Sequence, residues 1–178
     1  MPYITVYNNH GINEHRTIGT VLHELGHFAH FGQRGEYTGS AYSGFLNVYN
    51  LFKESYASYV GWYLGEEYYS TLGWIKSYLE ENMTGQSRQA WMKTSQITGA
   101  YYSPLYVDLI DNYNQADTDS SYNWDSISQV PHAIINEMAA ECTNWSSVKL
   151  YLDMYCGIYY TVTQYTNFIE PYEFWFSV

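Results

Sequence analysis

The segment His23-Glu24-Leu25-Gly26-His27 constrains the fold of this chain more than any other part of it. Its two histidines are four positions apart, a spacing that puts two side chains on one face of an α-helix about a turn apart. In a helix, both imidazoles can therefore reach one metal ion, and zinc is the ion that this pattern typically binds. Glu24 stands beside the pair, where its carboxylate can accept a proton. The segment predicts a helix that carries a zinc site with a general base next to it.

The length of 178 residues fits one domain, which we divide into a zinc-binding part over residues 1–70 and a helical part over residues 71–178. Hydrophobic residues make up 46% of the chain and aromatic residues 20%, so a sizeable core is possible. Charged residues are only 14%, against roughly 25% in an average soluble domain. Tyrosine, serine, asparagine, threonine and glutamine carry the polar character instead. This composition favours an exported protein, extracellular or at the cell envelope, over a cytosolic one.

Charge and hydropathy exclude several classes of partner. The net charge is −11 with seven lysines and arginines, which argues against nucleic acid and against an anionic membrane surface. No apolar run approaches the roughly 20 residues that a transmembrane helix needs. The chain starts Met1-Pro2-Tyr3 without a signal peptide, so an exported protein would here be represented by a mature or trimmed segment. Cys142 and Cys156 could form one disulfide or remain buried thiols, and neither belongs to a Cys-x-x-Cys zinc pair.

Apolar periodicity predicts a mainly α-helical chain with a short N-terminal β element. Apolar and polar residues alternate over residues 2–7, which indicates a strand. Residues 17–31 are expected to form the motif helix, which ends at Gly32 and Gly35. Its expected inner face consists of Ile18, Val21, Leu22, Leu25 and Phe28. A second long helix is expected over residues 48–69. Shorter helices are expected over residues 74–81, 87–97, 104–113, 126–142 and 145–155, with Pro131 tolerated only in a first turn. The tail over 159–178 fits a strand and a helix equally well.

A catalytic zinc usually has three protein ligands and an open position, so a third ligand must be found. His30 is one option, but a straight helix has difficulty wrapping three imidazoles around one ion. We therefore expect His30 to be a structural histidine, or one that supports the ligands through hydrogen bonds. The metzincin pattern is excluded, because it needs glycine and histidine where this chain has His30 and Gln33. Glu54, on the second expected helix, is the better third ligand.

The segment around Glu54, Lys53-Glu54-Ser55-Tyr56-Ala57-Ser58-Tyr59-Val60-Gly61-Trp62, resembles the glutamate helix of the gluzincin metallopeptidases. In the aminopeptidase branch of that family, the glutamate ligand precedes an aromatic residue, an alanine and a tyrosine. Those positions are matched here by Tyr56, Ala57 and Tyr59. The motif His-Glu-Leu-Gly-His-Phe-Ala-His and the long spacing to Glu54 are similar to the thimet-oligopeptidase-like branch. The resemblance covers roughly the first seventy residues.

This resemblance implies a peptidase in which Glu54 joins His23 and His27 on zinc. Glu24 would then act as the general base that takes a proton from the attacking water. Two features depart from the family pattern. Ser58 occupies the position where thermolysin-like enzymes have an aspartate that orients a ligand histidine, and only residues 4–7 represent the sheet that normally precedes the first helix. Ser58 is nevertheless a residue that could support a ligand by hydrogen bonding.

The tetrahedral oxyanion of peptide hydrolysis needs a second donor besides zinc, usually a tyrosine or histidine from the downstream part. The candidates are Tyr101, Tyr102, Tyr106 and His132. The expected substrate is a peptide or protein, and the aromatic content makes a glycoprotein conceivable. Two alternatives remain open. One is an inactive zinc-binding relative that works as a binding or structural module at the cell envelope, and the other is a zinc hydrolase of non-peptide amides or esters.

Overall fold

The structure, a computed structural model, describes residues 14–34, 48–69, 103, 105–110 and 127–176. Six helices lie within these residues, and they contain no strand. The helices are α1 (Glu14–Arg34), α2 (Val48–Tyr69), α5 (Leu105–Asp108), α6 (His132–Glu141), α7 (Trp145–Tyr159) and α8 (Val162–Phe176). The prediction of a mainly helical chain is confirmed. The expected strand over residues 2–7 and the expected helices over 74–81 and 87–97 lie outside the described residues.

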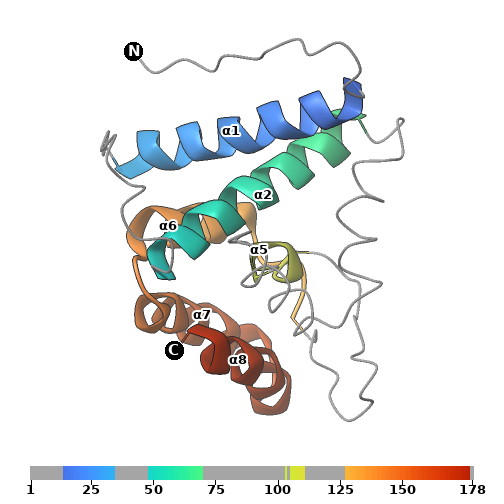
Figure 1. The fold of residues 1–178 in the computed structure, drawn as a ribbon. Coiled ribbons are helices and arrows are strands. Elements are labelled where there is room, and N and C mark those ends of the chain that lie inside the picture. The colour runs from blue at the N-terminus through green and yellow to red at the C-terminus, as the bar shows by residue number, and fades with distance from the viewer. Residues whose placement is uncertain (1–13, 35–47, 70–102, 104, 111–126, 177–178) are drawn as a thin grey trace.

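The two long helices α1 and α2 cross in the upper half of the molecule in Figure 1. Two glycines allow their backbones to approach closely. A Cβ added at Gly26 of α1 would lie 2.6 Å from the Cα of Ala57, and one added at Gly61 of α2 would lie 3.3 Å from the amide nitrogen of His23. Since these contacts lie beside the motif, the crossing point of the helices is also the place where the candidate ligands meet.

The core lies on the opposite side of α2 from α1. There, α2 packs against α5 and α6, and α7 and α8 close the lower end (Figure 1). The largest fully buried side chains in the described residues are Tyr106, Tyr172, Phe168, Leu105, Leu109, Ile127, Ile135, Met138 and Leu152, with His30 among them. Tyrosines form much of this core, because a buried ring removes a large apolar area from water while its hydroxyl finds a hydrogen-bond partner. The dense tyrosine content of the sequence is thus partly a packing feature.

Two expectations for α1, its inner face and its C-terminal end, were wrong. Leu25 is 39% exposed and Phe28 is 45% exposed, so both were wrongly assigned to the inner face. The inner face is narrower than the apolar pattern suggests, because Gly26 and His30 are the buried residues among positions 18–33, whose burial is described. The helix also continues to Arg34 and passes through Gly32, where an added Cβ would meet nothing within 4 Å.

Each of the three C-terminal helices starts at a residue that sequence rules associate with a helix start. Helix α6 starts after Pro131, six positions later than expected, because proline disfavours a helical conformation in the residue before it. Asn144 caps α7 by accepting a hydrogen bond from the Ser147 amide at 2.9 Å. At the start of α8, the Thr161 amide donates to Gln164 Oε1 at 3.1 Å. The tail whose structure the sequence left open is therefore a helix.

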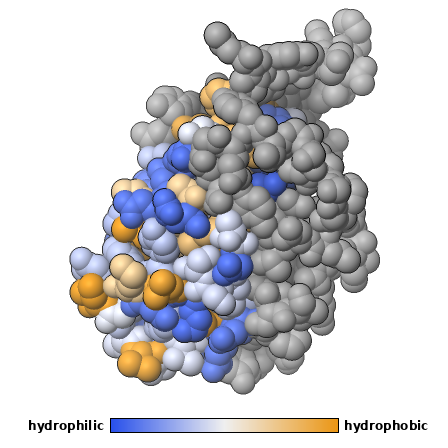
Figure 2. Space-filling view, turned by 90° about the vertical axis from the view of Figure 1, so that its left-hand side faces the viewer, coloured by the Kyte–Doolittle hydropathy of each residue, from blue (hydrophilic) through white to orange (hydrophobic). Residues whose placement is uncertain are grey.

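The outer side of α7 is apolar. Leu150, Met154 and Ile158 are 58%, 64% and 76% exposed, and their spacing of four residues puts them on one helix face. Hydrophobic surface is visible near the lower end of the molecule in Figure 2. The two thiols of the chain, Cys142 and Cys156, are both buried, and they do not form a disulfide.

Within the described residues, no helix combines the length and the apolar character that crossing a membrane requires.

Candidate metal centre

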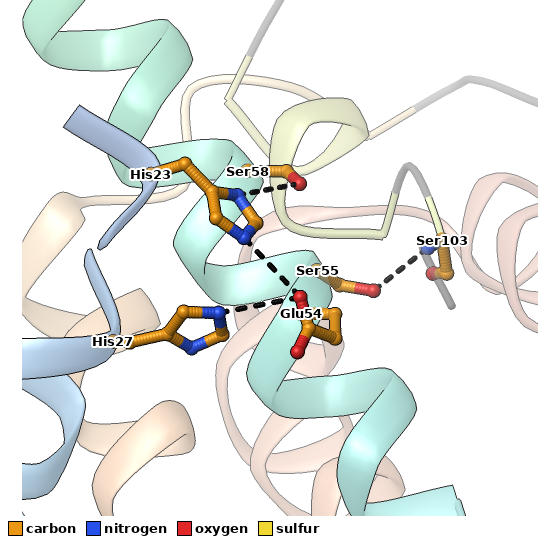
Figure 3. A network of polar contacts seen from close by, with 6 residues as sticks. All are labelled: His23, His27, Glu54, Ser55, Ser58 and Ser103. Carbon is orange, nitrogen blue, oxygen red and sulfur yellow. Dashed lines mark hydrogen bonds and ion pairs between the residues drawn. The ribbon is translucent and has the colours of Figure 1, made fainter. Parts of the chain in front are cut away.

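Three side chains from α1 and α2 converge at the helix crossing (Figure 3). Glu54 Oε2 lies 3.2 Å from His23 Nε2 and 3.2 Å from His27 Nε2. The two imidazole rings are perpendicular, with centroids 4.7 Å apart. All three candidate ligand atoms lie within 4.8 Å of one another, and this is the one such group of histidine, cysteine and acidic residues in the described part of the chain. The structure thus brings together the three residues that the sequence nominated as ligands.

This arrangement fits a tetrahedral divalent metal ion. Two imidazole nitrogens and one carboxylate oxygen form one of the common donor sets of catalytic zinc, with bonds of roughly 2.0–2.2 Å. Two ligands at that distance on a tetrahedron are about 3.4 Å apart, which is close to the observed 3.2 Å from Glu54 to each histidine. The side chains of His23, His27 and Glu54 are 18%, 16% and 25% exposed. The group is therefore reachable from solvent, as a site that must admit water or a substrate has to be.

Electrostatics keep the Glu54 carboxylate ionised. Burial raises its pKa, but hydrogen bonds from His23 and His27 and the charge of the two imidazoles outweigh burial and lower the pKa to about 2. A carboxylate that stays deprotonated at all physiological pH values is available as a ligand without first losing a proton. The site is thus prepared for a cation at neutral pH.

Ser58 lies on the side of His23 that faces away from Glu54. Its Oγ is 3.4 Å from His23 Nδ1, whereas the other ring nitrogen, Nε2, approaches Glu54 (Figure 3). A histidine that donates through Nδ1 presents the lone pair of Nε2 to a metal, because a neutral imidazole carries one proton. Ser58 therefore has the position expected of a supporting residue, although a hydroxyl at this distance holds the ring more weakly than a carboxylate would.

Ser55, which no sequence motif pointed to, binds the segment that precedes α5. Its buried Oγ accepts a hydrogen bond from the backbone amide of Ser103 at 2.7 Å (Figure 3). Ser103 in turn caps the start of α5, because its Oγ accepts from the Leu105 amide at 3.1 Å. Ser103 is thus bound to the residue that directly follows Glu54. Tyr101 and Tyr102 immediately precede Ser103 in sequence but lie outside the described residues.

His30 is not part of the ligand group. It is 2% exposed, and its Nε2 donates to the backbone carbonyl of Ala139 in α6 at 2.9 Å. That carbonyl lies in the last turn of α6, where helix carbonyls lack partners within their own helix. The amide of Thr143, the partner in a longer helix, donates instead to Ser147 Oγ at 3.3 Å. His30 thus caps a neighbouring helix, which is a structural role.

Two candidates for the oxyanion donor lie within the described residues. Tyr106 is 1% exposed and packs against Tyr56 and Tyr59 in the core, where its hydroxyl is closed off from the ligand group. His132 Nδ1 shares a hydrogen bond with the Tyr59 hydroxyl, and the His132 ring packs against Tyr63 with centroids 4.0 Å apart. Burial raises the pKa of Tyr59, so this phenol remains a donor. Tyr59 directly follows Ser58 and therefore projects about 100° around α2 from it. His132, which contacts Tyr59, thus meets α2 on a different face from Ser58.

Glu24, the expected general base, lies on α1 next to His23 and is exposed. It directly follows a ligand candidate in the sequence, and its side chain is open to solvent. A carboxylate there can exchange protons with water that approaches the three side chains. The arrangement as a whole can hold a divalent cation with one open side, beside an acid–base group.

Comparison with protein-family models, with curated proteins and with solved structures gave no match to this chain.

Proposed function

We propose that this protein is a zinc-dependent metallopeptidase of the gluzincin type. The observation that carries the proposal is the position of Glu54. This residue follows the histidine pair by 27 positions, yet its Oε2 lies 3.2 Å from both Nε2 atoms. A histidine pair with a glutamate beside it, joined by a carboxylate from the next helix, is the donor set of catalytic rather than purely structural zinc sites. Closed structural sites usually have four protein ligands, whereas the part of the chain that the structure describes gathers three.

When bound, zinc supplies a Lewis acid that polarises the scissile carbonyl and lowers the pKa of a coordinated water to about 7. Glu24 would accept the proton of the attacking water and deliver it to the leaving amine. Its exposed position one residue after His23 suits a residue that must contact both water and substrate. Ser58 would orient the ring of His23 through Nδ1.

The oxyanion that develops during hydrolysis requires a donor near Glu54. Of the four candidates from the sequence, we favour Tyr101 and Tyr102. The amide of Ser103, which directly follows Tyr102, is bound 2.7 Å from Ser55 Oγ, and Ser55 directly follows Glu54. Tyr106 is enclosed in the core and His132 is engaged by Tyr59, so neither is as well suited.

The proposed substrate is a peptide or protein, which could be a glycoprotein, and the proposed location is extracellular or at the cell envelope. The high net negative charge argues against nucleic acid as a partner. We further propose that residues 1–178 form one catalytic domain, with the zinc site in residues 1–70 and a helical subdomain in residues 71–178. A short N-terminal strand that aligns the substrate belongs to the same proposal.

A second candidate function is a zinc-binding protein without catalytic activity, because Ser58 occupies the position where thermolysin-like enzymes have aspartate. Its hydroxyl lies 3.4 Å from His23 Nδ1, a distance at which support for the ring is weak. Weak support favours a relative that retains zinc but serves as a binding or structural module.

Metal analysis and a pair of variants separate these functions. Protein purified without added metal is expected to contain about one equivalent of zinc per chain. Glu24→Gln should retain zinc and lose hydrolysis of a peptide library, whereas Glu54→Ala should lose zinc. If the wild-type protein retains zinc and cleaves no peptide in the library, the binding-module function is favoured. If it neither contains zinc nor binds it on titration, both functions are refuted.

A further inference from the structure

Helix α6 contacts both ligand-bearing helices through one face. His132, Asn136 and Ala139 are spaced so that they lie on the same side of α6. His132 Nδ1 shares a hydrogen bond with the Tyr59 hydroxyl of α2, Asn136 Oδ1 accepts from the Tyr56 hydroxyl of α2 at 2.9 Å, and the Ala139 carbonyl accepts from His30 of α1 at 2.9 Å. The first two of these α6 residues are thus bound to the helix that carries Glu54, and the third is bound to the helix that carries His23 and His27.

Two of the residues bound to α6, His30 and Tyr56, are anchors that lie close to a ligand along their own helices. His30 is three residues beyond His27, and Tyr56 is two residues beyond Glu54. At a rise of 1.5 Å per residue, each anchor is within about 5 Å of its ligand along the helix axis. A movement of either anchor would therefore be transmitted to the ligand with little loss.

Tyr56 connects all three helices. Its hydroxyl donates to Asn136 of α6, and a side-chain hydrogen bond from Gln33 of α1 also reaches it. The ring packs against His30, with centroids 5.8 Å apart. The close backbone contact at Gly26 sets the separation of α1 and α2, and these directional hydrogen bonds set the rotation of each helix about its axis.

We propose that α6 is the positioning element of the metal site, and that the hydrogen bond between Tyr56 and Asn136 holds Glu54 in register with the two histidines. This inference rests on the proposed metal-binding function. Tyr56 and Asn136 are positioning residues, since they act through the orientation of α2. Removing partners that orient metal ligands typically weakens metal affinity by about 10- to 100-fold. We expect the lower end of that range, because Tyr56 acts on Glu54 through the helix backbone.

The test is a titration of the metal-free protein with Co²⁺, in competition with a chelator of known affinity. The visible absorption of bound Co²⁺ reports coordination geometry independently of affinity. Tyr56→Phe and Asn136→Ala should each weaken Co²⁺ binding by about tenfold and alter the spectrum. The double variant should be no weaker than the single variants, because both remove the same hydrogen bond.

Tyr165→Phe is the matched control. Its hydroxyl also donates to a side chain on another helix, Asp153 of α7, but at the far end of the molecule from α1. This variant should bind Co²⁺ as the wild type does and give the wild-type spectrum. Denaturant unfolding of each metal-free variant establishes that the protein is folded during the titration. If Tyr56→Phe does not fold, Asn136→Ser provides the same comparison with a smaller change.

The inference and the proposed function fail in different ways. If wild-type and Tyr165→Phe proteins bind Co²⁺ and the α6 variants bind it with unchanged affinity and spectrum, the positioning role is overturned while the metal site stands. If the wild-type protein itself does not bind Co²⁺, the metal-binding function fails, and the inference fails with it.

Discussion

The contact between Gly26 and Ala57 yields the sharpest prediction, because it lies between the ligands. In Gly26→Ala, the new Cβ would lie 2.6 Å from Ala57 Cα, 3.0 Å from Ala57 O and 3.1 Å from Val60 Cβ. Ordinary van der Waals contact begins at 3.4 Å, so the helices must separate by about 0.8 Å at this point. Two of the three contacts are with backbone atoms of α2, which cannot rotate away as a side chain can. The separation would move α2, and Glu54 with it, away from the two histidines.

Two opposing effects set the magnitude. Forcing an extra carbon into a packed interface costs about 1–3 kcal/mol. Replacing glycine by alanine in a helix interior returns about 1 kcal/mol of helix propensity. The free energy of unfolding of the metal-free protein should therefore fall by about 0–2 kcal/mol. Metal binding should suffer more, because metal–ligand distances tolerate only about 0.2 Å, and we expect Co²⁺ affinity to fall at least about tenfold.

Gly19→Ala on the same helix is the control. A Cβ at Gly19 meets nothing within 4 Å, so this variant should gain up to about 1 kcal/mol of stability and leave metal affinity unchanged. Denaturant unfolding with a chelator present gives the stabilities, and Co²⁺ competition gives the affinities. If Gly26→Ala is as stable as Gly19→Ala and binds Co²⁺ as tightly as the wild type, the argument that helix spacing governs the site is wrong.

Three further predictions follow from individual contacts. In the metal-free protein, the pKa of Glu54 is lowered from 4.5 to about 2, so its stabilising contribution is complete above pH 4.5 and is lost as the pH falls towards 2. Glu54→Gln should accordingly flatten the acid limb of a plot of stability against pH, and an unchanged limb would contradict the ion pairs. Ser58→Ala should weaken Co²⁺ binding, with Ser58→Asp restoring or improving it, and equal affinities in all three proteins would rule out support of His23 by this residue. Asn144→Ala should lower the free energy of unfolding by about 1 kcal/mol in thermal denaturation, whereas Asn144→Ser should retain most of it.

Local patterns were sufficient to predict the helices that position the site. The second helix was expected over residues 48–69 and has those bounds, since its apolar and small residues recur at helical spacing over more than five turns. The meeting of Glu54 with His23 and His27 also agrees with the sequence, because the histidine motif and the small residues around Glu54 are both local signals. These signals specify what each helix presents at the crossing.

The remaining features depend on partners that are distant in sequence. Leu25 and Phe28 fit the apolar period of α1, and only the narrow contact with α2 explains why they are exposed. His30 finds its partner 109 positions away at Ala139, a pairing that nothing near either residue indicates. Helix α8 differs, because Thr161 and Gln164 have the spacing of a capping box and could have been read as a helix start. The aromatic and β-branched composition of the tail obscured that signal.

The two buried thiols can report local opening of this fold. Cys142 follows α6 directly and Cys156 lies within α7, so both are enclosed where these helices join the core. Burial raises the pKa of Cys156 to about 12, which leaves almost no reactive thiolate in the closed state at neutral pH. A thiol reagent can therefore label these cysteines only when this part of the protein opens. Labelling kinetics would measure the rate of that opening. A comparison with and without bound metal would show whether metal binding between α1 and α2 also slows the opening of α6 and α7.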